Sequence, residues 1–337
     1  MSGRDDDGGQ LGLSLAGGVE LAGEVDPLFL HLYARAEEYA SDALAPATRR
    51  LYVGEWRAFV SFCSLFGAAP LPAHPDTVRL YLAHMADRGR RPAGIDVALA
   101  AISHAHTRQG LKSPRSDRGV LETRSGIRRR LGVAQQPKGA MTTADLRAIV
   151  EAMPATPIGI RDRALLLLGW VGAFRPSELA ALLIADLSFQ PQPNAAPKLR
   201  VSVRRSKTDQ EGRGLYKWIP PASDETVCPV RATMAWLEVL SREAGPLFPG
   251  HRRNGWSEKP LCRRDVARRV KRGSTRAQLD AAPLSGASLR SGFVTAAVGA
   301  GKPIALIMAQ TGHRRAETLI RYVRGAALQS TAAEGLL

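Results

Sequence analysis

The second half of the chain holds basic and phenolic side chains of the kinds that act on phosphodiesters. An arginine fork matches the equatorial oxygens of a phosphoryl-transfer transition state and binds them in a bidentate way. A tyrosine hydroxyl can attack phosphorus and store the bond energy as a phosphotyrosyl ester, and a lysine on a hairpin can protonate a leaving oxygen. The residues in suitable contexts are Arg175, Lys207, Arg290 and Tyr322. Their combination indicates a covalent, reversible reaction at a phosphodiester.

Arg290 stands in the apolar stretch SGASLRSGFV, beside a helical face that Leu289 and Phe293 are spaced to form. A half-buried guanidinium needs an anionic partner, yet Asp280 is the one carboxylate within ten residues of it. We therefore expect Arg290 to bind an anion from outside this stretch.

Several other catalytic signatures do not occur in the sequence. It contains no GxxxxGK[ST] loop, no HExxH helix, no dense carboxylate cluster for two metal ions and no G-x-S-x-G elbow. Cys63, Cys228 and Cys262 are far apart and lack metal-ligand spacing, which favours a reduced cytoplasmic compartment. The longest apolar run, ALLLLGWVGAF, is too short to span a bilayer. We expect a reaction that needs no metal, no ATP and no other cofactor.

The chain carries a large positive charge. Its 337 residues include 47 Lys and Arg against 31 Asp and Glu, a net charge of +16. Residues 1–26 hold one basic and six acidic side chains, so the remainder carries +21. Such a surplus favours a polyanion, and nucleic acid fits it. The alternatives are a surface that serves solubility and a compositional drift toward arginine in a GC-rich genome.

Periodicity and composition predict a mainly α fold with a small β-hairpin or sheet, arranged as two domains. The predicted segments are a disordered N-terminus at 1–24, a helical domain at 25–132, a linker at 133–141, a mixed α/β domain at 142–325 and a tail at 326–337.

Basic residues gather at the ends of the helices expected in the first domain. Taken singly, each is more often a solvated surface residue, but as a set they favour contact with DNA phosphates. They are Arg49, Arg50, Arg90, Arg91, Arg128, Arg129 and Arg130.

One clear β signal lies in the second domain. Leu199, Val201 and Val203 alternate with polar residues, a turn follows at 209–214, and LYKWIP is the expected return strand. Lys207 lies beside this turn. The neighbouring arginines of the hairpin are further candidates for DNA contact: Arg204 and Arg205. Helices that end at glycine are expected after the hairpin, over 285–301, 303–312 and 316–325.

Four stretches of the second domain resemble the catalytic domain of the tyrosine recombinases, the phage integrase family, of the Cre-like two-domain type. GAFRPSELAAL resembles the first-arginine box, RSKTDQEGRG the hairpin-lysine box, GASLRSGFVTAA the H-x-x-R box, and TGHRRAETLIRYV the closing box. The first domain and linker are similar to the family's helical, SAM-like core-binding domain. The matching positions are Arg175, Glu178, Lys207, Arg290, His313 and Tyr322.

The resemblance implies a mechanism for the residues that face the DNA. Tyr322 would attack the scissile phosphate and form a 3′-phosphotyrosyl bond, while Arg175 and Arg290 hold the non-bridging oxygens. Lys207 would protonate the leaving 5′ oxygen. Taken alone, a tyrosine in LIRYV is most often a core residue and a turn lysine is most often solvated. The order of the four boxes favours the catalytic interpretation.

The resemblance also implies supporting roles, and it exposes a departure. Glu178 would support the site from behind, and His313 would donate a hydrogen bond to the phosphate. The H-x-x-R box has Ala287 where the family usually has histidine and sometimes lysine. A methyl group cannot accept the proton of the attacking tyrosine. The change is either natural and tolerated, engineered to trap an intermediate, or the mark of a chain that binds DNA and recombines poorly; we expect reduced, non-zero cleavage.

Three functions stay open from the sequence. The first is a bacterial, cytoplasmic, nucleoid-associated recombinase that is monomeric off DNA and forms a homotetramer on two double-stranded sites, with no membrane partner. The second is a catalytically impaired DNA-binding or regulatory member of the same fold, which Ala287 favours and Tyr322 and Lys207 oppose. The third is a type IB topoisomerase, which the helical first domain opposes.

Overall fold

The computed structural model describes residues 13–15, 19–21, 26–133, 139–193, 195–204, 214–317 and 319. The chain divides into two compact units between Gln135 and Gln136. Each unit buries a hydrophobic core of its own.

The first unit is helical. Proline occupies the first position of each of its first four longer helices, where the missing N–H would have had no partner inside the helix. A short antiparallel pair, β1 (Leu13–Leu15) and β2 (Val19–Leu21), precedes them. The helices are α1 (Pro27–Asp42), α2 (Pro46–Leu65), α3 (Pro75–Asp87), α4 (Pro92–Arg108), the 3-10 turn η1 (Pro114–Ser116) and α5 (Arg118–Leu131).

Aromatic and aliphatic side chains from α2, α3 and α4 fill the core of the first unit. Phe59 is fully buried and its ring lies 5.2 Å from that of Tyr81. His106 is also fully buried, where Nε2 accepts from the Ala73 amide at 2.9 Å and Nδ1 lies 2.8 Å from the Ile102 carbonyl. These two contacts use both ring nitrogens, so His106 is a structural residue of this core.

The second unit combines helices with small antiparallel sheets. Its helices are α6 (Thr143–Glu151), α7 (Pro157–Val171), α8 (Pro176–Ala180), α9 (Pro229–Leu240), α10 (Arg263–Arg276), α11 (Ala287–Gly299) and α12 (Ile304–Thr311), with 3-10 turns η2 (Ile184–Asp186) and η3 (Glu225–Val227). Its strands are β3 (Leu187–Gln192), β4 (Ala195–Val203), β5 (Leu215–Ile219), β6 (Pro249–Arg252) and β7 (Gly255–Pro260).

The predicted hairpin is confirmed and belongs to a larger sheet. Strands β4 and β5 pair antiparallel with Val201 opposite Lys217, and β3 adds a third strand in the order β3-β4-β5. Leu199, Val201 and Val203 are buried, as their alternation predicts. The β3 strand and the separate β6–β7 pair were not predicted.

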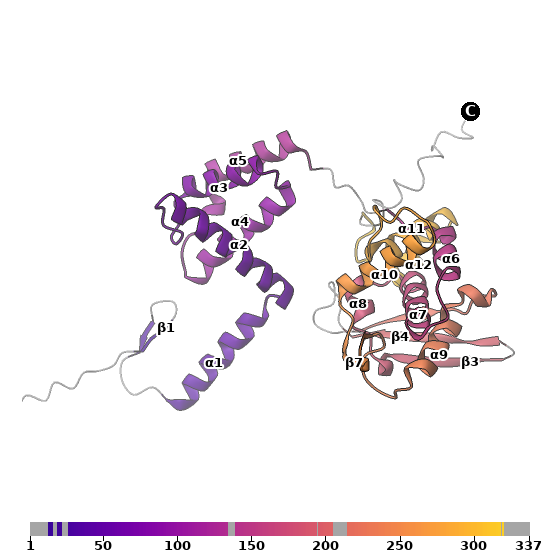
Figure 1. The fold of residues 1–337 in the computed structure, drawn as a ribbon. Coiled ribbons are helices and arrows are strands. Elements are labelled where there is room, and N and C mark those ends of the chain that lie inside the picture. The colour runs from indigo at the N-terminus through magenta and orange to yellow at the C-terminus, as the bar shows by residue number, and fades with distance from the viewer. Residues whose placement is uncertain are drawn as a thin grey trace, which may run out of the picture. The chain divides into compact units, whose positions relative to one another are not determined.

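Helix α7 lies at the centre of the second unit (Figure 1) and contacts α6, α8, α9, α10 and α11. Gly169 lets Leu289 of α11 approach closely, because an added Cβ would stand 2.9 Å from its Cδ1. At Gly292 an added Cβ would stand 2.0 Å from the Met141 carbonyl oxygen, which also accepts from Trp170 Nε1 at 3.0 Å. These contacts fix α11, and with it Arg290, against α7.

Candidate active site

Two helices of the second unit end close to the same group of side chains. Helix α7 ends at Val171, and Ala173 then adopts a φ of +46°. Helix α12 ends at Thr311, and Gly312 adopts a φ of +71° as its left-handed cap. The first-arginine box and the closing box therefore both begin where a left-handed residue turns the chain away from a helix. We refer to residues 171–173 and 310–311 as the two helix ends.

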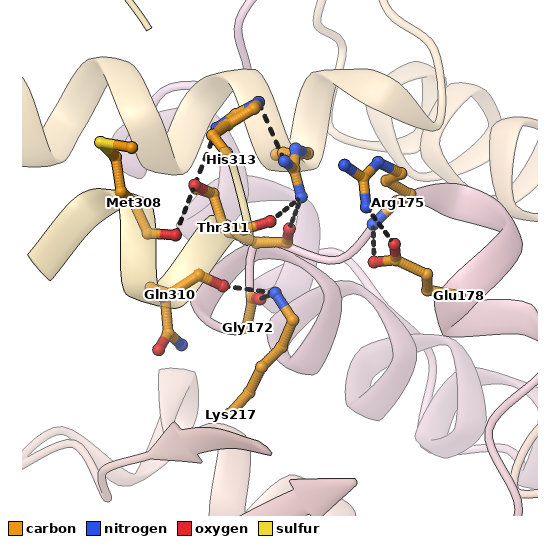
Figure 2. Close-up of polar contacts among 10 residues, drawn as sticks. Gly172, Arg175, Glu178, Lys217, Met308, Gln310, Thr311 and His313 are labelled. Atoms are coloured by element: carbon orange, nitrogen blue, oxygen red, sulfur yellow. Dashed lines mark hydrogen bonds and ion pairs between the residues drawn. The ribbon is translucent and has the colours of Figure 1, made fainter. Parts of the chain in front are cut away.

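Arg175 occupies the N-cap position of α8 and is held by Glu178, three residues later (Figure 2). Arg175 Nη1 lies 2.5 Å from Glu178 Oε1, and the Arg175 amide donates to Glu178 Oε2 at 3.0 Å. The carboxylate is 3% exposed and the guanidinium side chain 18% exposed. Glu178 thus fixes both the main chain and the side chain of Arg175 from the buried side.

Arg290 is buried at 6% exposure in the first turns of α11 and joins the two helix ends. Its Nη1 donates to the Ala173 carbonyl at 2.8 Å and to the Thr311 carbonyl at 2.6 Å. Its Nη2 lies 2.9 Å from His313 Nε2. The partners described for this guanidinium are therefore carbonyl oxygens and an imidazole, supplied by segments far from it in sequence.

His313 is in its neutral form in this arrangement. Burial first, and then the charges of Arg290, Arg175 and Lys217, together lower its pKa from 6.5 to about 4. A guanidinium can only donate, so Nε2 accepts from Arg290 and the ring proton is on Nδ1, 2.8 Å from Thr311 Oγ1. Both ring nitrogens are engaged, so the expected contact with a phosphate requires a change of partner when DNA binds.

Lys217 is the cation of this region that the sequence interpretation missed. It reaches from β5 to the two helix ends, where its ammonium donates to the Gly172 carbonyl at 2.7 Å and to the Gln310 carbonyl (Figure 2). It is 1% exposed and lies 4.9 Å from the centre of the Phe174 ring. Burial lowers the pKa of Lys217 from 10.5 to about 7; Glu178 opposes this shift, and Arg290 and Arg175 add to it.

Ala287 lies at the start of α11, one turn before Arg290, and its side chain is exposed. Its amide donates to Ser285 Oγ at 3.3 Å and its carbonyl accepts from Ser291 Oγ at 3.2 Å. These bonds use only its main chain, so the residue supports the helix start. Its methyl group offers no proton acceptor on the side of the helix that carries Arg290.

The other predicted residues divide into three groups. Tyr322, Lys207 and Arg205 lie outside the described residues. Arg50, Arg91, Arg129 and Arg130 are exposed. The remaining arginines each contact a carboxylate: Arg49 with Asp42 at 3.2 Å, Arg90 with Glu55, Arg128 with Asp96 at 2.7 Å and Arg204 with Asp186 at 2.6 Å. The Asp186 carboxylate is buried.

Helix α10 presents a basic face that the sequence interpretation also missed. Its apolar side, with Val266 and Val270, is buried in the core of the second unit. Its exposed cations recur at helical spacing, which could have revealed the face: Arg263, Arg264, Arg268, Lys271, Arg272 and Arg276.

Within the described ranges, no group of three or more His, Cys, Asp or Glu side chains is arranged to hold a metal ion. No helix in this part of the chain is both long and apolar enough to cross a membrane.

Comparison with known proteins identifies the family. The phage integrase family profile matches residues 140–328. An integrase/recombinase XerD homologue of Selenomonas ruminantium is 32% identical over 294 residues, covering 86% of this chain and 84% of that protein. The tyrosine recombinase XerD of Xanthomonas axonopodis pv. citri is 28% identical over 191 residues, which cover 53% of this chain and 56% of that protein. The chain belongs to the phage integrase family of tyrosine recombinases, as its four boxes predict.

Solved structures share the fold. A lambda integrase dimer bound to a COC′ core site has a TM-score of 0.59 at 17% identity, covering 91% of this chain and 83% of that chain. The XerH recombinase bound to a palindromic difH substrate, in a post-cleavage complex, has a TM-score of 0.52 at 15% identity, covering 76% of this chain and 69% of that chain. The predicted fold class, mainly helical with small antiparallel sheets, is confirmed.

Proposed function

We propose that this protein is a site-specific DNA recombinase that cuts and rejoins duplex DNA through a 3′-phosphotyrosyl intermediate. The observation that supports this best is the convergence of Arg175, Arg290 and His313 beside the two helix ends. Three segments of the chain meet there, each from a different recombinase box. Cationic side chains in a partly buried site suit the charge that develops on a phosphoryl group.

The proposed reaction exchanges one ester for another. The Tyr322 oxygen attacks the scissile phosphorus, the bond to the 5′ oxygen breaks, and Lys207 protonates that oxygen as it leaves. Arg175 and Arg290 stabilise the negative charge on the non-bridging oxygens. The free 5′-hydroxyl of a partner strand then attacks the phosphotyrosyl ester and releases Tyr322. Because no step is a hydrolysis, the energy of the phosphodiester is kept in the phosphotyrosyl ester and ATP is not needed.

Ala287 makes the first step slower in this proposal. The phenol proton has no imidazole to receive it, so water accepts the proton while the cations of the site stabilise the phenolate. Loss of a general base costs roughly 10²–10⁴-fold in rate. The chain therefore cleaves slowly.

DNA contact involves both units in this proposal. The basic face of α10 and the exposed arginines of the first unit, Arg129 and Arg130 among them, contact phosphates. The solved lambda integrase and XerH complexes, which have the same fold, contain DNA. The active assembly is a homotetramer on two sites.

A covalent trapping experiment tests the function. Duplexes enriched from a random library by binding to the protein supply the target, and a nick placed just downstream of each candidate phosphate lets the cleaved fragment diffuse away. We expect a slow protein–DNA adduct on a denaturing gel from the natural chain, and an adduct that forms about 10²–10⁴-fold faster from Ala287→His. Tyr322→Phe is the matched control, which should bind with unchanged affinity and form no adduct.

Ala287 also supports a second candidate, a DNA-binding regulator on the same scaffold. This second function predicts that the natural chain binds DNA specifically and forms no adduct, and that Ala287→His forms one. No adduct from either chain on any nicked duplex contradicts the recombinase proposal.

A further inference from the structure

Three consecutive carbonyl groups at the end of α7 each accept a hydrogen bond from a side chain of another element. The donors are Gln310 for residue 171, Lys217 for residue 172 and Arg290 for residue 173. The end of α12 is held by two of the same elements, because the carbonyls of residues 310 and 311 accept from Lys217 and Arg290. Two cations therefore connect the same two helix ends, one from β5 and one from α11.

A cation at this place has an electrostatic reason. The carbonyl ends of α7 and α12 carry the negative poles of both helix dipoles, and here they converge. Lys217 neutralises part of that negative potential directly behind Arg175, Arg290 and His313. Without it, the negative poles of the two helix ends would repel one another and shift the residues that they carry.

Lys217 does not touch the DNA or the reacting atoms. Its side chain is 1% exposed, and its ammonium already donates to two carbonyls. Among the described residues, no carboxylate forms an ion pair with it, although Glu178 acts on it through space. An apolar side chain would fill this place without the cost of burying a charge, so stability alone does not account for a lysine here.

We propose that Lys217 is a positioning residue of the strand-cleavage reaction, which holds the ends of α7 and α12 together and so sets Arg175 against His313 and Arg290. This inference rests on the proposed recombinase function. Its test measures the rate of adduct formation at saturating DNA, separately from DNA affinity, on the enriched nicked duplexes.

Replacement of Lys217 by methionine keeps the volume and removes the cation. Because small displacements of catalytic groups cost up to about 10²-fold in rate, we expect Lys217→Met to form the adduct roughly 10- to 100-fold more slowly. Its DNA affinity and salt dependence should stay within about twofold of the natural chain, since it touches no phosphate. Lys198→Met is the matched control, an exposed lysine of the adjoining strand β4, and it should leave the rate unchanged.

The variant Lys217→Arg distinguishes a cation that positions the two helix ends from a side chain that only fills space in the core. Arginine can donate to both carbonyls and stays charged at every pH, whereas the lysine loses its proton as pH rises through about 7. The groups facing it are Glu178 and Arg175 of α8, Arg290 of α11, and His313 after α12. The rate of Lys217→Arg divided by that of the natural chain should therefore rise between pH 6 and pH 8.5.

The outcomes separate the two proposals. If neither the natural chain nor Ala287→His forms an adduct, the recombinase function fails and the role of Lys217 fails with it. If an adduct forms, and Lys217→Met retains both the rate and the pH profile of its parent, only the role of Lys217 is wrong. If thermal unfolding shows that Lys217→Met does not fold, the test uses Lys217→Arg. A Lys217→Arg chain whose rate of adduct formation depends on pH as its parent's does overturns the inference. When the natural chain is slow, the same series is made in the Ala287→His background.

Discussion

The first unit and the candidate active site hold their cations in different ways. In the first unit, Arg90 contacts Glu55, and Arg124 and Arg128 share Asp96 at 2.5 and 2.7 Å. In the candidate site, Lys217 and Arg290 donate to main-chain carbonyls at two helix ends. A carboxylate cancels a whole unit of charge, whereas a carbonyl dipole stabilises a cation and leaves its net charge in place.

This difference shows that the number of arginines in a segment does not tell where an anion binds. The arginines of the first unit that contact carboxylates contribute little to the field that a phosphate meets. In the candidate site Arg175 also has a carboxylate partner, Glu178, so the cations held by carbonyls there are Lys217 and Arg290. A cation that helix dipoles hold creates a positive potential at a fixed place while it is protonated. An arginine stays protonated, whereas Lys217 keeps its charge below a pH of about 7. The comparison leads to four predictions, from the largest expected effect to the smallest.

Arg290→Met should have the largest effect on the stability of the fold at neutral pH. It leaves the carbonyls of Ala173 and Thr311 buried without this donor, so we expect the free energy of unfolding to fall by about 2–5 kcal/mol. Arg128→Met, which breaks a half-exposed ion pair, should cost less than about 1 kcal/mol. Urea unfolding of both variants measures the contrast, and equal losses would remove the distinction between the two kinds of cation.

Lys217 should make stability depend on pH in the alkaline range. Its pKa is about 7 in the folded protein and near 10.5 in the unfolded chain, so the unfolded chain binds more protons between these values. The free energy of unfolding contributed by this residue therefore rises with pH from about 7 to 10.5, by an amount on the order of 3–5 kcal/mol.

The measurement is the difference between the natural chain and Lys217→Met, because other groups titrate in the same range. The variant should be the more stable of the two near pH 6, and the difference should shrink as pH rises. A difference that is constant from pH 6 to pH 10 would mean that Lys217 keeps an ordinary pKa.

Neighbouring arginines on α5 should differ in their effect on DNA binding. Arg129 is exposed, and its substitution by alanine should lower the salt slope of binding by about one. Arg128 contacts Asp96, so Arg128→Ala should leave the slope nearly unchanged. Asp96→Asn releases the charge of Arg124 and Arg128 and should raise the slope. DNA-binding titrations at several salt concentrations measure these slopes. Equal salt slopes for the two alanine variants would contradict the distinction between exposed and paired arginines.

Ala173→Gly should have the smallest effect, and a favourable one. Ala173 has a φ of +46°, which strains a residue with a Cβ, and glycine removes the strain at some cost in chain entropy. We expect a gain in the free energy of unfolding of at most about 1 kcal/mol, measured by thermal unfolding. A loss larger than that would mean that packing of the buried Ala173 methyl outweighs the strain.

Local signals in the sequence were enough to predict much of the fold. The end of α12 at Gly312 and the β4–β5 hairpin follow from glycine at a helix end and from strict alternation. The β3 strand was not predicted because it is an edge strand containing Pro191, which weakens its β signal. The β6–β7 pair was not predicted because β6 has only four residues and lies in a polar segment.

The site was only partly predictable, for a physical reason. The box residues Arg175, Arg290 and His313 have motifs around them, whereas Lys217 has none. Its place in β5 puts it on the same face as Leu215 and Ile219, which marks it as buried. Its partners are carbonyls at helix ends about 45 and 93 residues away, and no local pattern in the sequence describes them.

The left-handed turn at Gly312 sets a length limit on Tyr322, the proposed nucleophile. Its amide is tied to the Met308 carbonyl at 2.7 Å, and the preceding turn is held by Lys217 and Arg290. Ten residues further along the chain, Tyr322 cannot stand more than roughly 35 Å from this fixed point, since extended chain covers about 3.5 Å per residue. In the proposed reaction, a protomer can therefore cut only at a phosphate that its Tyr322 reaches within that distance of Gly312.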